Sequence, residues 1–197
     1  MQCPPSATGC TPVKILAAAA LLFLIVVFVE GAFRSGYDPT RHMISALSLG
    51  DHGWVQVANF ILFGVGMLVF AIGLYLDLDM VADPVLIAVF GLGAIVSGVF
   101  SMDPSYGCPP RTPRGTSRPT RHHLIHGAAG PIMFLSIFVA CLVLADSLDQ
   151  PWPIYTYVTA AVGLLLTVAV ALAAQRDSMR TGLIQEDLYW CTGPGSL

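Results

Sequence analysis

Charged side chains are scarce in this sequence. Only 11% of the 197 residues are Asp, Glu, Lys or Arg, whereas soluble domains carry roughly 25%. So few charges cannot cover the surface of a soluble domain of this length, and that class of protein is excluded. The apolar residues are gathered into runs of about 20, the length that crosses the hydrocarbon core of a bilayer. The composition therefore predicts a polytopic membrane protein.

Basic residues are few, and the cysteines do not form pairs. Lysine and arginine together number 9 and the net charge is −3, which argues against a nucleic-acid partner because such proteins present a basic surface. The 5 cysteines include no CxxC pair and no other zinc-binding spacing. We expect unpaired thiols, apart from a Cys3–Cys10 bridge that an extracellular N-terminus would allow. No cofactor is expected.

Five apolar runs are long enough to span a membrane. They cover residues 13–33, 54–76, 84–102, 122–145 and 154–174. We expect an all-α transmembrane helix bundle with these five spans as one domain at 13–174, between tails at 1–12 and 175–197. The first run exceeds the signal-peptide core of about 7–15 residues, so an uncleaved first span is expected. Small residues at Gly91, Ala94 and Gly98 predict that the third span packs centrally.

Two polar stretches interrupt these runs. They lie on the same side of the membrane, because two spans separate them. The first, GYDPTRHMISAL at 36–47, holds Asp38, Arg41, His42 and Ser45. Asp38 before Pro39 is favourable for a helix N-cap. We therefore expect a short interfacial helix or turn over 38–47, with His42 and Ser45 on one face.

The second polar stretch, residues 103–126, contains Asp103, Arg121 and a histidine cluster. His122 and His126 are four positions apart on one helix face, a spacing that can give two imidazoles to one metal ion. Asp103 would add an oxygen ligand. These three residues form a zinc hypothesis, in which the bound metal lowers the pKa of a water molecule to about 7 for hydrolysis.

Several single side chains add to this pattern. Ser117 or Thr120 is suitably placed to cap the helix of the fourth span. Gln56 and Asn59 share a face in the first turns of the second span, where amides in lipid bond to neighbouring helices. Asn59 is also a candidate ligand-binding residue. Glu30, near the end of the first span, is expected at headgroup depth.

The segment YDPTRHMISALSLGDHGWVQVANF resembles the opening of the domain of unknown function 998 family, uncharacterised polytopic membrane proteins of bacteria and archaea. The matching features are Tyr37-Asp38-Pro39, Ile44-Ser45-Ala46-Leu47, Asn59-Phe60, Asp103-Pro104 and a histidine, His126 or one of its neighbours. The resemblance covers about residues 13–174 and brings no known activity with it. It implies a plan of six spans, of which the last is missing here. A shortened chain end would explain the missing span.

Two arguments about orientation disagree. All basic residues except Lys14 lie on the side of the polar stretches, and the positive-inside rule would make that side cytoplasmic. The resemblance implies the opposite orientation. We follow the resemblance, because a whole fold constrains topology more strongly than arginines in a binding loop. We expect a multi-pass protein of the cell membrane with its polar stretches outside the cytoplasm.

The candidate ligand-binding residues are the polar side chains expected at this face: Asp38, Arg41, His42, Ser45, Asn59, Asp103, Arg121 and His126. Arginine binds lipid phosphate well. The first hypothesis is therefore a membrane protein that binds an anionic lipid headgroup or a small polar ligand. The alternative is a metal-dependent intramembrane hydrolase of a lipid-like substrate, similar in chemistry to alkaline-ceramidase and progestin-receptor-like hydrolases.

A small transporter is a third hypothesis. The scarcity of ionisable groups at mid-membrane depth counts against proton coupling in such a transporter. Helix capping and ordinary interfacial polarity would also explain many of the same residues without any ligand.

Overall fold

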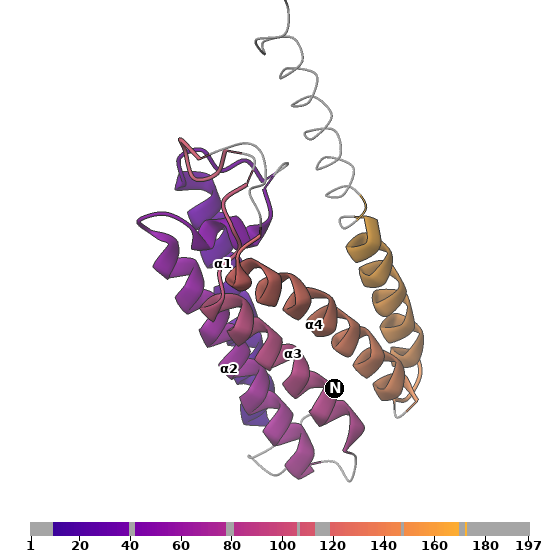
Figure 1. Cartoon of the computed structure of the whole chain (residues 1–197). Helices are drawn as coiled ribbons and strands as arrows, with labels where there is room; N and C mark the ends of the chain where they lie inside the picture. Colours follow the sequence, from indigo (N-terminus) through magenta and orange to yellow (C-terminus); the bar gives the residue numbers. More distant parts are fainter. Residues whose placement is uncertain are drawn as a thin grey trace, which may run out of the picture.

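The structure is a computed structural model that describes residues 10–39, 42–77, 81–105, 107–112, 119–146, 148–169 and 172. Within these residues, all of the long secondary-structure elements are helices (Figure 1). The elements are α1 (Cys10–Phe33), the short 3-10 helix η1 (Ile44–Ser48), α2 (Gly53–Asp77), α3 (Ala82–Val99), α4 (Arg121–Ala145) and a fifth long helix, Trp152–Ala169. All 5 long helices can cross a membrane, which confirms the five-span all-α bundle. Arg41 and the C-terminal tail lie outside the described residues.

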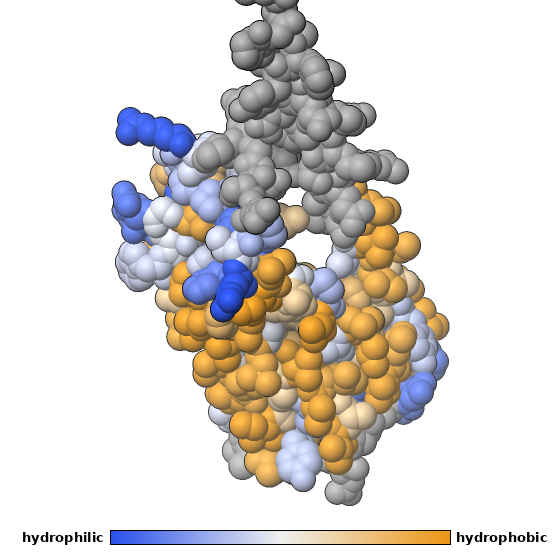
Figure 2. Space-filling model, in the orientation of Figure 1, coloured by the Kyte–Doolittle hydropathy of each residue, from blue (hydrophilic) through white to orange (hydrophobic). Residues whose placement is uncertain are grey.

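The long helices pack in chain order, α1 on α2, α2 on α3 and α3 on α4. The fifth helix contacts α4, where the Tyr157 hydroxyl donates to Asp146 Oδ1 at 2.7 Å. Large apolar side chains such as Phe28, Leu135 and Leu165 are exposed on the outer faces. Figure 2 shows hydrophobic residues over most of one face and hydrophilic residues gathered toward its upper end. This is a multi-pass membrane protein, and we call the end that carries η1 and the loop after α3 its polar end.

Small residues allow α3 to pack between α2 and α4. A Cβ atom added to Gly64 of α2 would lie 2.5 Å from the carbonyl oxygen of Gly91 on α3. A Cβ atom added to Gly93 would lie 2.8 Å from Cβ of Met133 on α4. Such close backbone approach stabilises helix pairs in lipid, where the hydrophobic effect between helices is absent. The expected central position of α3 is confirmed.

The helix α3 ends earlier than its apolar run. Its last residue is Val99, rather than residue 102 as the sequence predicted. Phe100 leaves the helical conformation, with φ −106° and ψ 94°. Met102 then packs with Ala46 and Cys108 in a small apolar cluster. Because this cluster joins η1 to the loop after α3, it holds the two polar stretches together.

The short helix of the first polar stretch is smaller than predicted. It covers only Ile44–Ser48, and its N-cap is Met43 rather than Asp38. The backbone carbonyl of Asp38 accepts from the His42 N–H at 2.8 Å, and the Asp38 N–H donates to His42 Nδ1 at 2.8 Å. Asp38 and His42 are therefore bonded to each other ahead of the helix, which starts at Ile44.

A prediction about packing concerns Gly64. The Gly64→Ala substitution is expected to destabilise the bundle by about 1–3 kcal/mol, the typical cost of overpacking, because the added methyl would collide with α3. The control is Gly127→Ala on α4, where a Cβ atom meets nothing within 4 Å. Thermal unfolding in detergent should show a lowered Tm for Gly64→Ala only. Equal Tm values for the two variants would contradict the proposed contact.

Candidate functional site

A hydrogen bond joins the two polar stretches. His126 Nε2 lies 3.0 Å from Ser45 Oγ. His126 Nδ1 lies 2.9 Å from the carbonyl oxygen of Phe100 and 3.2 Å from that of Ser97. Since carbonyl oxygens only accept, Nδ1 carries the proton in this arrangement. In the neutral ring Nε2 is then an acceptor, so the Ser45 hydroxyl donates to it.

Three elements hold this pair. His126 belongs to the first turns of α4, and the two carbonyl groups lie at the C-terminal end of α3, where backbone carbonyls lack helical partners. The partial negative charge of a helix C-terminus favours an N–H donor at this place. Ser45 is held in η1 because its neighbours Ala46 and Leu47 are only 3% and 0% exposed. The Ser45 and His126 side chains themselves are partly exposed.

Asp103 anchors the start of α4. Its Oδ1 accepts from the Thr120 hydroxyl at 2.6 Å and its Oδ2 from the Thr120 N–H at 2.8 Å. Thr120 Oγ1 in turn accepts from the His123 N–H at 3.2 Å as the helix N-cap, which confirms one of the two predicted caps. The Asp103 N–H donates to His123 Nδ1 at 3.1 Å. The carboxylate is therefore part of the support of α4.

The environment of Asp103 favours its ionised form. Partial burial on its own would raise the pKa of this carboxyl, but the two hydrogen bonds from Thr120, with His123 and His122 nearby, hold the pKa below its ordinary value of 3.8. Because the pKa is lowered in the folded state, the contribution to stability is fully present above pH 3.8. It is lost as the pH falls through the lowered value.

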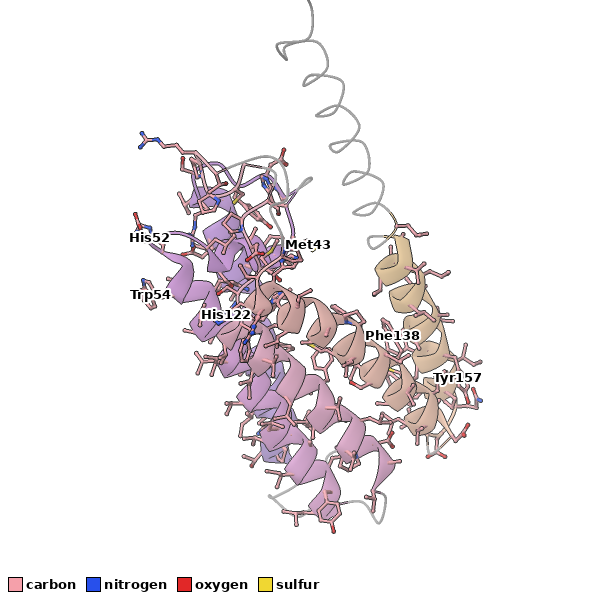
Figure 3. All side chains as sticks on the ribbon, in the orientation of Figure 1. Met43, His52, Trp54, His122, Phe138 and Tyr157 are labelled. Atoms are coloured by element: carbon pink, nitrogen blue, oxygen red, sulfur yellow. The ribbon has the colours of Figure 1, made fainter. Side chains whose placement is uncertain are left out.

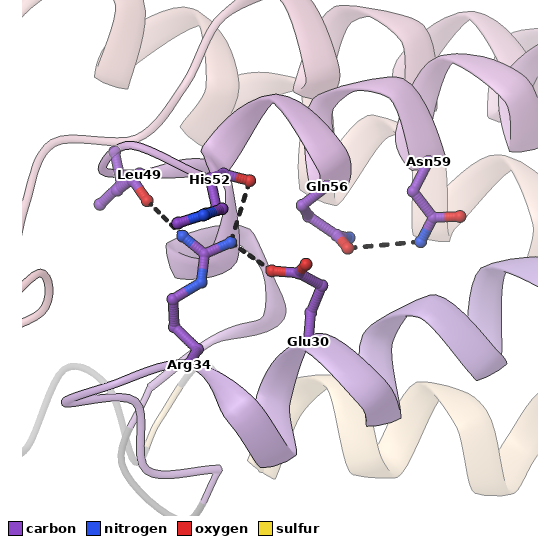
Figure 4. A network of polar contacts seen from close by, with 6 residues as sticks. All are labelled: Glu30, Arg34, Leu49, His52, Gln56 and Asn59. Carbon is purple, nitrogen blue, oxygen red and sulfur yellow. Dashed lines mark hydrogen bonds and ion pairs between the residues drawn. The ribbon is translucent and has the colours of Figure 1, made fainter.

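A second polar network lies at the ends of α1 and α2 (Figure 4). The Arg34 guanidinium donates to the carbonyl oxygens of Leu49 at 2.9 Å and His52 at 3.1 Å, and it forms an ion pair with Glu30. The sequence analysis placed Glu30 at headgroup depth but missed Arg34. The four-residue spacing of this opposite-charge pair was the available signal. The network ties α1 to the loop that carries Ser45.

Other predicted site residues have separate roles. The Asn59 amide donates to the Phe23 carbonyl at 3.1 Å and to Gln56 Oε1 at 3.3 Å, so it joins α2 to α1 as buried amides were expected to do. His42 accepts from the Asp38 N–H and packs on the Tyr37 ring at 5.7 Å. His42 and Ser45, expected on one face, thus have different partners.

Residues 17–186 match the family described as Protein of unknown function (DUF998). The chain belongs to this family. The match includes both polar stretches and confirms the resemblance, which covers about residues 13–174. Among curated proteins and among solved structures, nothing matches the chain. Membership of DUF998 therefore shows which proteins the chain is related to but gives no activity, so the activity has to be argued from the site.

The zinc hypothesis for this DUF998 chain involves His122, His126 and Asp103. In the structure both ring nitrogens of His126 have other partners, and both Asp103 oxygens accept from Thr120. His122 packs edge-on against the Phe100 ring at 5.2 Å. Among the described residues, no three His, Cys, Asp or Glu side chains gather as metal ligands would. The zinc site stays a prediction, and it would need these side chains to rearrange.

The contacts between Thr120 and Asp103 at the start of α4 lead to a second prediction. Replacing Thr120 with Ala is expected to cost about 1–2 kcal/mol, because the N-cap bond and the hydroxyl bond to Asp103 Oδ1 are both lost, while the backbone N–H still bonds to Oδ2. Thr120→Ser keeps the hydroxyl and should stay close to the wild-type Tm in detergent. In a double-mutant cycle, adding Asp103→Ala to Thr120→Ala should cost less than Asp103→Ala alone. Additive losses would show that the two residues act independently.

Proposed function

We propose that this DUF998 protein binds an anionic lipid headgroup, or a small polar ligand of the same chemistry, at the polar end of its bundle. The observation that carries the proposal is the 3.0 Å contact between Ser45 and His126. It brings side chains from two distant polar stretches to one place. Polar side chains that converge beside apolar ones are what a ligand site requires.

The first turns of α4 supply contacts for both parts of a lipid. Arg121 and His122 are exposed, and arginine forms paired hydrogen bonds with phosphate oxygens. Leu124 and Ile125, close by on the same helix, are exposed and apolar. Figure 3 places Met43 and His122 at this same end of the bundle.

The headgroup proposal predicts the effect of removing one charge. Arg121→Gln should lower the amount of anionic phospholipid that co-purifies with the protein, measured by lipid mass spectrometry. The expected change in affinity is about five-fold, since one basic residue at a membrane surface contributes about 1 kcal/mol. Lys14→Gln removes the same charge near the opposite end of α1 and is the control. Equal lipid content in both variants would count against the proposal.

We also propose that the polar end faces away from the cytoplasm. The family plan supports this orientation. The positive-inside rule supports the reverse, but at least one of the arginines it counts serves the fold, because Arg34 is held by Glu30 and by two loop carbonyls. The position of such an arginine reflects its contacts within the fold as well as the side of the membrane on which it lies.

Labelling of introduced cysteines tests the orientation. Cys108 itself is unsuitable because it is only 1% exposed. An Arg111→Cys variant places a thiol at an exposed position of the loop after α3. It should react with a membrane-impermeant maleimide on intact cells, above the background of the unmodified chain. Val81→Cys, exposed at the other end, should react only after permeabilisation. The opposite pattern would establish a cytoplasmic polar end.

A further inference from the structure

From the Ser45–His126 geometry we infer that Ser45 is a nucleophile and His126 its general base, acting on a carboxylic ester of a lipid-like molecule. The inference rests on the proposed headgroup site, because that site would present the ester to Ser45. It goes beyond ligand binding in naming a covalent reaction. It also requires no metal ion.

The geometry meets the conditions for an activated serine. The hydroxyl and the imidazole lie within hydrogen-bond reach at 3.0 Å, and a third group orients the base. Here the third group is a pair of carbonyl oxygens at the end of α3, both bonded to Nδ1. They hold the tautomer in which Nε2 accepts a proton, and they stabilise the imidazolium that forms when it does.

The cysteine near this end is a poorer nucleophile. Cys108 is almost fully buried in the cluster with Ala46 and Met102. Burial raises the pKa of its thiol, although Arg34 acts in the opposite direction. A thiol that stays protonated and covered does not attack a substrate readily. Ser45, by contrast, is partly exposed and its hydroxyl is bonded to an imidazole.

The side chains around Ser45 favour a substrate with an acyl chain. Met43 and Ile44 precede it and are 48% and 41% exposed. Leu124 and Ile125 precede His126 and are also exposed. Apolar groups on both sides of a polar pair would accommodate a hydrocarbon chain next to an ester group. A water-soluble ester would leave these side chains uncovered.

The reaction balances with water as the only co-reactant. Ser45 Oγ attacks the ester carbonyl carbon while its proton passes to His126 Nε2. The tetrahedral intermediate collapses, the bond to the alcohol oxygen breaks, and the departing alcohol takes the proton from Nε2. Water then attacks the acyl-serine and gives a proton to Nε2. When the acyl bond breaks, this proton returns to Ser45 Oγ and a carboxylic acid is released.

A fluorophosphonate probe, which reacts covalently with activated serines, tests the inference on the full-length protein in detergent. Mass spectrometry is expected to find the label on Ser45. The rate of labelling should fall about 100-fold or more in His126→Ala, the usual contribution of a general base. His126→Gln keeps a hydrogen-bonding side chain without a base and should lose labelling equally. Ser101→Ala removes a nearby hydroxyl outside the pair and should label as the wild type does.

Two outcomes would overturn the inference. One is a folded wild-type protein with no label on Ser45. The other is a His126→Gln variant that labels as fast as the wild type, because His126 would then act only as a structural partner. A Tm measured on each variant shows whether it is folded. Ser45→Ala should lose the label. If that variant does not fold, Ser45→Cys replaces it, because the thiol keeps a donor for His126, and it should lose the label as well.

The substrate class is tested with p-nitrophenyl decanoate. Wild-type protein is expected to release p-nitrophenol faster than Ser45→Ala, and equal rates would overturn the ester assignment. Lipid content measured on the same preparations separates the two proposals. An unlabelled Ser45 with Arg121-dependent lipid overturns the nucleophile alone. A labelled Ser45 with lipid content independent of Arg121 overturns the headgroup site alone.

Discussion

The hydrogen bond from Ser45 to His126 depends on the early end of α3. If α3 continued to residue 102, the Ser97 carbonyl would accept its own helical hydrogen bond and would no longer be directed to His126. The chain leaves the helix at Phe100 instead, and Met102 packs against Ala46 and Cys108. The same departure frees two carbonyl oxygens and brings η1 close. The contact across 81 positions of the sequence thus depends on where one helix stops.

The polar groups at this end fall into two sets: those whose hydrogen bonds support the fold, and those that are left to contact a ligand. Arg34 donates to the carbonyl oxygens of Leu49 and His52, and it forms an ion pair with Glu30. Asp103 uses both of its carboxylate oxygens on Thr120. These bonds make irregular backbone tolerable at the edge of a membrane, where unpaired peptide groups are costly. A ligand would therefore meet mainly the exposed first turn of α4 and the partly exposed pair beneath it.

Local pattern predicted much of the fold and little of the site. The apolar runs gave the five helices because length and hydropathy are local properties, and small residues indicated the central position of α3. Thr120 was recognisable as a cap from its place before a helix. His126 was listed among the ligand-binding residues, and the zinc hypothesis paired it with His122 because the i, i+4 spacing is visible in sequence. The actual partners of His126 lie on η1 and at the end of α3, and no local spacing encodes them.

The contrast between Asn59 and Ser45 bears on what the pair at the polar end is for. Asn59 is buried in the bundle, so its amide must find a partner, and the Phe23 carbonyl satisfies that need. Ser45 and His126 are partly exposed, where water or headgroups could satisfy either group. The carbonyl groups of α3 already set the tautomer of His126 without Ser45. Burial therefore does not force the bond between them, which agrees with the reactive role that we propose for the pair.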